Sequence, residues 1–175
     1  MNEIETVTDY VTGKELPLIG PEGNRQLFEK VLVEEKGYKP EEITVDRPID
    51  LTVNGEPYGS VVDIIVTVEN KAVMAARCIA GSLASYEREV LAAARLVFDY
   101  RIPFSVSTDG ESALVRDTAT GKPYGEGMDN VPSRRQALEM MDTLDFTPIP
   151  EEKKEREKII FRSYDMVRYE DECRG

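Results

Sequence analysis

Two adjacent apolar runs carry the residues of this chain whose types and spacing can do chemistry. Asp63 is the only charged residue in the run 61–68, and a polar turn joins this run to a second one, residues 72–80. Acids on two neighbouring strands can bind Mg²⁺ together, and a lysine beside them can activate water or stabilise a phosphate in its transition state. The second run carries Arg77 and Ile79 where such a site needs its second acid and its lysine. The layout of a carboxylate-metal site is therefore present without two of its three chemical groups.

The turn between the two runs determines which side chains face one another. With a three-residue turn, antiparallel pairing places Asp63 directly opposite Arg77. Side chains alternate between the two faces of a strand, so Ile79 shares the face of Arg77. We therefore predict an ion pair between Arg77 and either Asp63 or Glu22, in the place of a metal ligand.

An acid from the following helix is an alternative way to complete the site. Glu87 and Glu89 lie at the start of that helix, and we take Glu87 as the candidate for a migrated acid. Lys71 or Lys122 would then have to replace the missing lysine. Acids on helices are more often simply solvated, so both interpretations stay open.

Turn and helix signals around these runs predict an α/β domain. Pro21 opens a helix that Gly37 ends, and Asn54-Gly55 is a strong signal for a hairpin. We expect the first three strands to form a contiguous antiparallel meander with the next helix packed across the sheet. The predicted strands are 43–53, 58–68, 73–80, 103–108 and 112–117, and the predicted helices are 22–36, 83–100, 133–141 and 151–173.

The chain is long enough for one domain with a substantial core, followed by a helical tail. We divide it into an N-terminal arm (1–20), a domain (21–141), and a linker with a C-terminal helix (142–175). The tail helix either packs back on the domain or forms a homodimer or partner contact through residues 151–170. Its apolar residues at helical spacing, expected to make that contact, are Ile159, Ile160, Tyr164 and Val167.

Composition excludes several classes of function. Histidine is absent, which rules out Ser-His and Cys-His hydrolases and histidine-ligated metals. Cys78 and Cys173 are too few for a disulfide framework or a zinc site, and we expect Cys78 to be a buried apolar residue. The net charge of −12 weighs against binding nucleic acid unaided, so DNA is at most a weak partner. No run is long enough for a membrane span and no signal peptide is present, so we expect a cytoplasmic protein.

Several short stretches occur in the order and at the spacing of a known family. Over roughly residues 8–136 the chain resembles the N-terminal nuclease domain of type I restriction enzyme R subunits. The stretches that carry the resemblance are Glu22-Gly-Asn-Arg25-Gln26, Glu35-Lys-Gly37-Tyr38, Val62-Asp63-Ile-Ile-Val, Ala76-Arg-Cys-Ile-Ala80, Ala93-Ala-Arg95-Leu, Ile102-Pro103-Phe, Thr108-Asp109-Gly110 and Thr120-Gly121-Lys122.

The resemblance implies the restriction-endonuclease-like PD-(D/E)XK fold, a mixed central sheet flanked by helices, with Mg²⁺-dependent DNA cleavage in active members. By position, Glu22 matches the family's first-helix acid and Asp63 its metal-binding aspartate. Where the family commonly has Glu-Cys-Lys-Ala, Arg77 and Ile79 take the places of the acid and the lysine. Both the second metal ligand and the catalytic lysine are missing from this pattern.

Three interpretations of function follow. The favoured one is a stand-alone nuclease-fold protein with a degenerate active site and no cofactor, which binds a partner or a nucleic acid. The first alternative is an active Mg²⁺- or Mn²⁺-dependent DNA endonuclease that uses Glu22, Asp63 and Glu87. The second alternative is a homodimeric scaffold. Because 175 residues leave no room for a helicase motor, we do not expect a complete, translocating R subunit.

Overall fold

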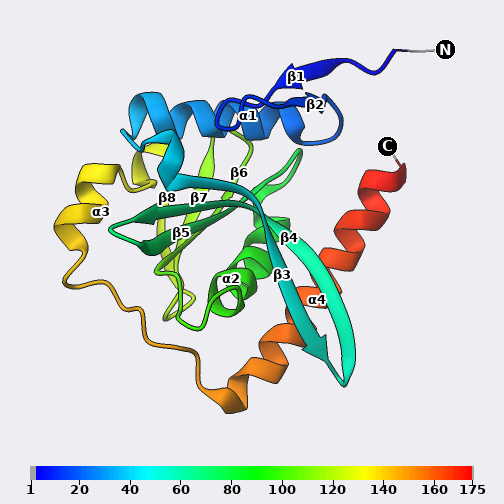
Figure 1. The fold of residues 1–175 in the computed structure, drawn as a ribbon. Helices are drawn as coiled ribbons and strands as arrows, with labels where there is room; N and C mark the ends of the chain where they lie inside the picture. The colour runs from blue at the N-terminus through cyan, green and yellow to red at the C-terminus, as the bar shows by residue number, and fades with distance from the viewer. Residues whose placement is uncertain (1–2, 175) are drawn as a thin grey trace.

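The computed structural model describes residues 3–174, with side chains up to residue 167, and contains a six-stranded sheet with helices on both faces (Figure 1). The strands of this sheet are β3 (Ile43–Val53), β4 (Glu56–Val68), β5 (Lys71–Cys78), β6 (Phe104–Thr108), β7 (Ala113–Asp117) and β8 (Pro123–Glu126). The α-helices are α1 (Glu22–Lys30), α2 (Glu87–Leu96), α3 (Arg134–Met140) and α4 (Glu151–Arg174). The strands lie in the order of the chain, and only β5 and β6 are parallel. The predicted fold class, a mixed sheet flanked by helices with a helical tail, is confirmed.

Strands β3, β4 and β5 form the predicted antiparallel meander. Asn54 and Gly55 both have positive φ at the first turn, as a tight hairpin requires. The β4–β5 register pairs Ile64 with Ala76, which sets Asp63 against Arg77 as predicted. The turn has two residues instead of the predicted three, and a register shift between Val66 and Thr67 makes up the difference. Strand β8 was not predicted, because only four residues with a proline at their start form it.

The ladder between β3 and β4 skips one pair, that of Asp46 with Asp63, although the pairs on both sides are formed. Asp46 has a φ of 52° at this point, in the left-handed region. The regular backbone pairing of the two strands is interrupted at these two acids. Each acid can therefore pair with an arginine outside β3 and β4.

Helix α2 crosses from β5 to the parallel strand β6. The predicted helix 83–100 is too long, because residues 83–86 form a 3-10 turn and the α-helix begins only at Glu87. Residues 89–94 are all buried, since α2 lies between the sheet and α4. The helix is therefore covered on every side in its middle.

Two hydrophobic clusters lie on opposite faces of the sheet. The first holds Phe28 and Leu32, from α1 and the π-helical turn that follows it, against Ile64 of β4. The second holds Val90 of α2 and Phe161 of α4 among residues of the other face. Cys78 is buried and free, as predicted, and burial raises the pKa of its thiol. The side chain of Cys173 lies outside the part of the chain whose side chains are described.

Helix α4 packs back on the domain, against α2 and β3. Figure 1 shows it along the long β3–β4 hairpin. Of the four apolar residues expected to make its contact, Ile160 packs against the second cluster, whereas Ile159, Tyr164 and Val167 are exposed. Up to residue 167, the buried positions of the helix are Glu157, Phe161 and Asp165. Two of these three buried residues are acids, and apolar periodicity does not register acids as a buried face.

The N-terminal arm forms a small hairpin, β1 (Thr6–Thr8) with β2 (Glu15–Pro17), beside α1 (Figure 1). Backbone amides after β1 bind this helix: Tyr10 N–H donates to Gln26, and Val11 N–H donates to Glu29. Residues 1–2 lie outside the described part of the chain. Within residues 3–174, no helix combines the length and the apolar character that a membrane crossing requires.

Candidate functional site

Arg77 is the centre of a buried ionic cluster at the end of β5. Its side chain is 1 % exposed. Nη1 donates to Asp63 Oδ1 at 2.8 Å and to the carbonyl oxygen of Val61 at 3.2 Å, and Nη2 donates to Glu89 Oε1 at 2.5 Å. The predicted ion pair between Arg77 and Asp63 is confirmed.

Asp63 binds with both of its carboxylate oxygens. Oδ1 accepts from Arg77, and Oδ2 accepts the backbone N–H of Cys78 at 2.8 Å. This second bond ties β4 to β5 where their regular pairing has ended. Asp63 therefore links β4 to β5 through both of its oxygens, one bonded to the guanidinium of Arg77 and the other to the backbone amide of Cys78.

The helices α2 and α4 contribute the other acids of the cluster. Glu89 and Asp165 are both fully buried, and Asp165 Oδ1 lies 3.6 Å from Arg77 Nη2. The other oxygen of Asp165 accepts a hydrogen bond from the hydroxyl of Tyr58 at 2.5 Å. Asp165 was not anticipated, because nothing near Asp63 in the sequence points to a residue so far along the chain.

Glu87, the candidate for a migrated acid, does not join this cluster. Its carboxylate accepts a hydrogen bond from Nε of Arg116 on β7 at 2.6 Å. Of the two acids at the start of α2, it is Glu89 that faces Arg77. The 3-10 turn before α2 shifts the phase of the helix, and sequence alone does not give that phase.

The electrostatics of the cluster keep Arg77 charged. Burial works against a charged guanidinium, but the charges of Asp63, Glu89 and Asp165 raise the pKa of Arg77 above its ordinary value. Together with Asp63, Glu89 and Asp165, this arginine forms what we call the Arg77 cluster. Its single positive charge lies among the carboxyl groups of all three acids.

The lysine position of the family pattern is occupied by a buried apolar side chain. Ile79 is 3 % exposed, and its carbonyl oxygen accepts a hydrogen bond from Asn24 Nδ2 of α1. Lys71, one proposed substitute, sits at the β4–β5 turn with its ammonium 4.2 Å from the ring centroid of Tyr100. Lys122, the other, is exposed on the turn before β8. Neither lysine is paired with the Arg77 cluster.

Glu22, the first-helix acid, belongs to a second ionic cluster around Arg25 of α1. Its Oε1 accepts hydrogen bonds from Arg25 Nε at 3.0 Å and from Gln26 at 2.8 Å. Arg25 Nη1 donates to Asp46 at 2.7 Å, at the break in the β3–β4 ladder. The members of this Arg25 cluster are Arg25, Asp9, Glu22, Glu29 and Asp46.

Glu29 is the strongly perturbed acid of the Arg25 cluster. Its side chain is fully buried. Burial, followed by the charge of nearby Asp9, raises the pKa of Glu29 to about 8, and Arg25 offsets only part of this rise. Glu29 therefore changes its charge near neutral pH. The raised pKa of Glu29 could not be predicted from the sequence, because an acid in a helix is usually solvated.

The residues at the family's metal position do not fit a divalent cation. Such an ion needs several oxygen ligands around one point, and the oxygens of Asp63 are taken by Arg77 and by an amide. Among the described residues, no group of three or more cysteine or acid side chains is arranged to hold a metal ion. The guanidinium of Arg77 supplies a positive charge at the place where a metal would bring one.

The fold defines the class of this protein as a mixed α/β domain, a six-stranded sheet flanked by helices. The family model of the type I restriction enzyme R protein N terminus matches residues 20–132. The chain belongs to this family. No curated protein and no solved structure matches the chain significantly.

Proposed function

We propose that this chain is a catalytically degenerate member of its family, which uses the nuclease fold to bind a partner rather than to cleave DNA. The observation that carries the proposal is the buried guanidinium of Arg77, bonded to Asp63. The resemblance places the family's second metal-binding acid at this position. An acid has therefore been replaced by a base that neutralises the remaining metal ligand.

At the position of the family's lysine, no side chain can take part in cleavage. Ile79 can neither donate a proton nor stabilise the charge that develops on a phosphate. Asp63 is only 8 % exposed and Arg77 only 1 %, so a phosphodiester does not reach them. Asp165 of α4 adds a third acid, and its helix covers this side of the sheet. A stable ion cluster remains where an active member performs catalysis.

A cleavage assay tests the proposal. We expect the purified protein to cut supercoiled plasmid DNA poorly or not at all in the presence of Mg²⁺ or Mn²⁺. The matched control is Asp63→Ala, which should give the same background. If the unmodified protein cuts robustly and Asp63→Ala abolishes the cutting, the active enzyme with Glu22, Asp63 and Glu87 becomes the better account.

Metal titration separates loss of binding from loss of catalysis. We expect isothermal titration with Mn²⁺ to give no specific heat, with the same trace for the unmodified protein and Asp63→Ala. The double variant Arg77→Glu with Ile79→Lys restores the acid and the lysine of the family pattern. If it folds, as circular dichroism would show, it should gain Mn²⁺ binding. Tight Mn²⁺ binding by the unmodified protein would contradict the proposal.

A homodimeric scaffold is the second candidate function, and the outer face of α4 favours it. Met166 and Val167 are each more than half exposed, and Ile159 is 39 % exposed. Apolar residues gathered on one outward helix are typical of a contact with another protein. Light scattering coupled to gel filtration should show a dimer that the double variant Met166→Ser with Val167→Ser weakens. Lys153→Ser, on the polar part of α4, is the control and should leave the mass unchanged.

A further inference from the structure

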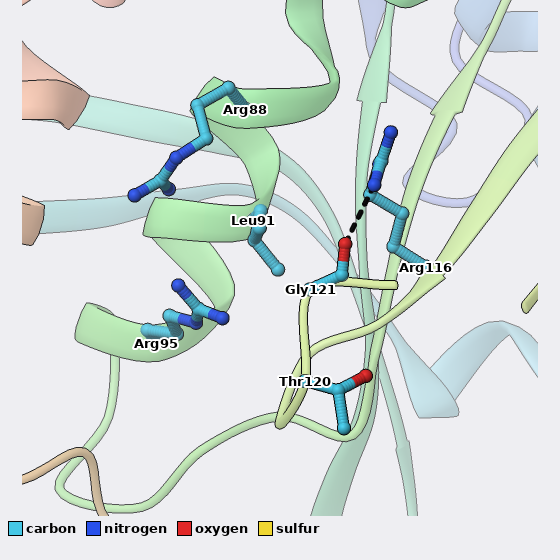
Figure 2. Close-up of a pocket in the computed structure, with 6 residues that line it drawn as sticks. All are labelled: Arg88, Leu91, Arg95, Arg116, Thr120 and Gly121. Carbon is cyan, nitrogen blue, oxygen red and sulfur yellow. Dashed lines mark hydrogen bonds between the residues drawn. The ribbon is translucent and has the colours of Figure 1, made fainter. Parts of the chain in front are cut away.

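A separate pocket lies between α2 and the turn that joins β7 to β8. It has a volume of about 340 Å³, within the range of small-ligand sites. Figure 2 shows Leu91 and Arg95 on α2 facing the turn, with Arg116 on the opposite wall. None of its lining residues is a bonding partner of Arg77. The residues that line the pocket are Arg88, Leu91, Arg95, Arg116, Thr120 and Gly121.

Two of the arginines are held in place and keep one nitrogen available. Arg95 donates through Nε to the carbonyl of Thr118 and through Nη1 to Glu157, and Arg116 donates through Nε to Glu87 and through Nη1 to the carbonyl of Gly121. Neither Nη2 donates to any of the described residues. Two oriented donors are therefore left over at the pocket without a protein acceptor.

The turn at the bottom of the pocket is preformed. Asp117 accepts hydrogen bonds from the backbone and the hydroxyl of Thr120, which closes the turn. Gly121 has a φ of 72°, and a Cβ there would lie 3.4 Å from Arg95 Nη2 and 3.4 Å from Leu91. Glycine thus supplies both the backbone conformation and the room beside the arginine.

Three arginines gather at this pocket although the chain has a net charge of −12. Three guanidinium groups line it, and two carboxylates, those of Glu87 and Glu157, are paired with them. Asp117, which closes the turn below, supplies a third carboxylate, so the pocket offers arginine donors rather than an excess of positive charge. Burial lowers the pKa of Arg95; the charge of Glu157 offsets part of this fall, and the nearby cations Arg88 and Arg101 add to it.

We propose that this pocket binds the phosphate group of a small phosphate ester, with Arg95 and Arg116 as its ligands. The planar fork of arginine matches phosphate oxygens, and charge-assisted bonds of this kind are the strong ones. A polynucleotide is a poorer candidate, because its many phosphates would be repelled by the acidic surface around one small pocket. This site goes beyond the proposed function, since it needs no residue of the Arg77 cluster.

Isothermal titration at constant ionic strength tests this inference with inorganic phosphate, adenosine monophosphate and adenosine as probes. Inorganic phosphate and adenosine monophosphate should both bind at this pocket, and adenosine should not bind. Arg95→Gln and Arg116→Gln should each weaken binding at least about tenfold, the loss expected for one charge-assisted contact. Arg135→Gln, which removes one charge from an exposed position, is the matched control and should bind as the unmodified protein does.

Amide spectra of the unmodified protein keep the test valid even if a variant fails to fold. Inorganic phosphate should shift the amide signals of Thr120 and Gly121 in a saturable way. The inference is overturned if phosphate causes no saturable shift, or if Arg135→Gln weakens binding as much as Arg116→Gln. Tighter binding of a short phosphorylated oligonucleotide than of adenosine monophosphate would equally overturn the small-ligand assignment.

Discussion

The Arg77 and Arg25 clusters place an arginine among several acids in two different ways. Arg77 and two of its three acids, Glu89 and Asp165, are almost completely shielded from water. The Arg25 cluster has open edges, because the side chain of Asp46 is 54 % exposed and that of Glu22 is 17 % exposed. Each cluster takes one acid from the interrupted step of the β3–β4 ladder, Asp46 bonding Arg25 and Asp63 bonding Arg77.

The difference teaches what each cluster does for the molecule. Charges without access to water must be neutralised by one another, so the Arg77 cluster joins the sheet, α2 and α4 into one body. Charges that water can reach contribute less to stability. The position that resembles a catalytic centre is thus the closed one, and the cluster around the first-helix acid is the one that water reaches.

Removing the buried arginine should have the largest effect. Arg77→Met leaves three acids without their cation in a dry environment, and we expect it to lower the free energy of unfolding by about 3 to 5 kcal/mol. Urea unfolding followed by circular dichroism measures the loss. Arg135→Gln, at an exposed position, should cost almost nothing. A loss below about 1 kcal/mol for Arg77→Met would mean that the acids of the cluster are neutral or hydrated.

The same change in the open cluster should cost less. Arg25→Met removes bonds to Asp46 and Glu22, but water can replace part of them at both carboxylates, so we expect a loss of about 1.5 to 3 kcal/mol. Urea unfolding under the conditions used for Arg77→Met makes the two values comparable. Equal losses at the two arginines would remove the distinction between a closed and an open cluster.

The features of the Arg77 cluster that depend on local strand pairing could be predicted from the sequence. The hairpin turn and the alternation of side chains gave the order of β3, β4 and β5 and the ion pair between Asp63 and Arg77. The choice between Glu87 and Glu89 could not be predicted, because it depends on where α2 begins after the 3-10 turn. A change of start by one residue rotates every later side chain by about 100°.

The contact that α4 makes with the domain could not be predicted, because two of the three residues on its buried face, Glu157 and Asp165, are acids. Glu157, Phe161 and Asp165 recur every four residues, which is helical spacing, but the apolar pattern directs attention to Ile159 and Tyr164 instead. The available signal was complementary charge: Arg88 and Arg95 lie on one face of α2, and both bind Glu157. Matching acids on one helix with arginines on another requires the fold to be known first.

Glu29 is the acid of the Arg25 cluster whose pKa is strongly raised, although its own side chain is fully buried. In the unfolded chain Glu29 has its ordinary pKa of about 4.5, and in the folded protein its pKa is about 8. Between these values the folded protein holds a proton that the unfolded chain has released. The stability that Glu29 contributes is therefore fully present below about pH 4.5 and is lost as the pH rises through about 8.

Glu29→Gln should remove this dependence, because a glutamine resembles the protonated acid at every pH. Near pH 5 the variant and the unmodified protein should unfold alike, and at pH 9 the variant should be more stable by about 1 kcal/mol or more. Urea unfolding at a series of pH values gives the comparison. Glu35→Gln, at an exposed position of the same segment, is the control. A difference that does not change with pH would argue against a raised pKa.

The smallest effect is expected at the exposed edge of the Arg25 cluster. Asp46→Asn removes one carboxylate from Arg25. It adds no backbone strain, because asparagine tolerates the left-handed φ of 52° found there. A half-exposed ion pair is worth about 0.2 to 1 kcal/mol, and the variant should lose no more than this. In 1 M NaCl, where the screening length is about 3 Å, most of the loss should disappear. The loss for Arg77→Met should persist in the same salt, since ions do not enter the buried cluster. Salt thus separates the two arginines more directly than the size of either loss, and a salt-sensitive Arg77→Met would show that water reaches the cluster that we describe as closed.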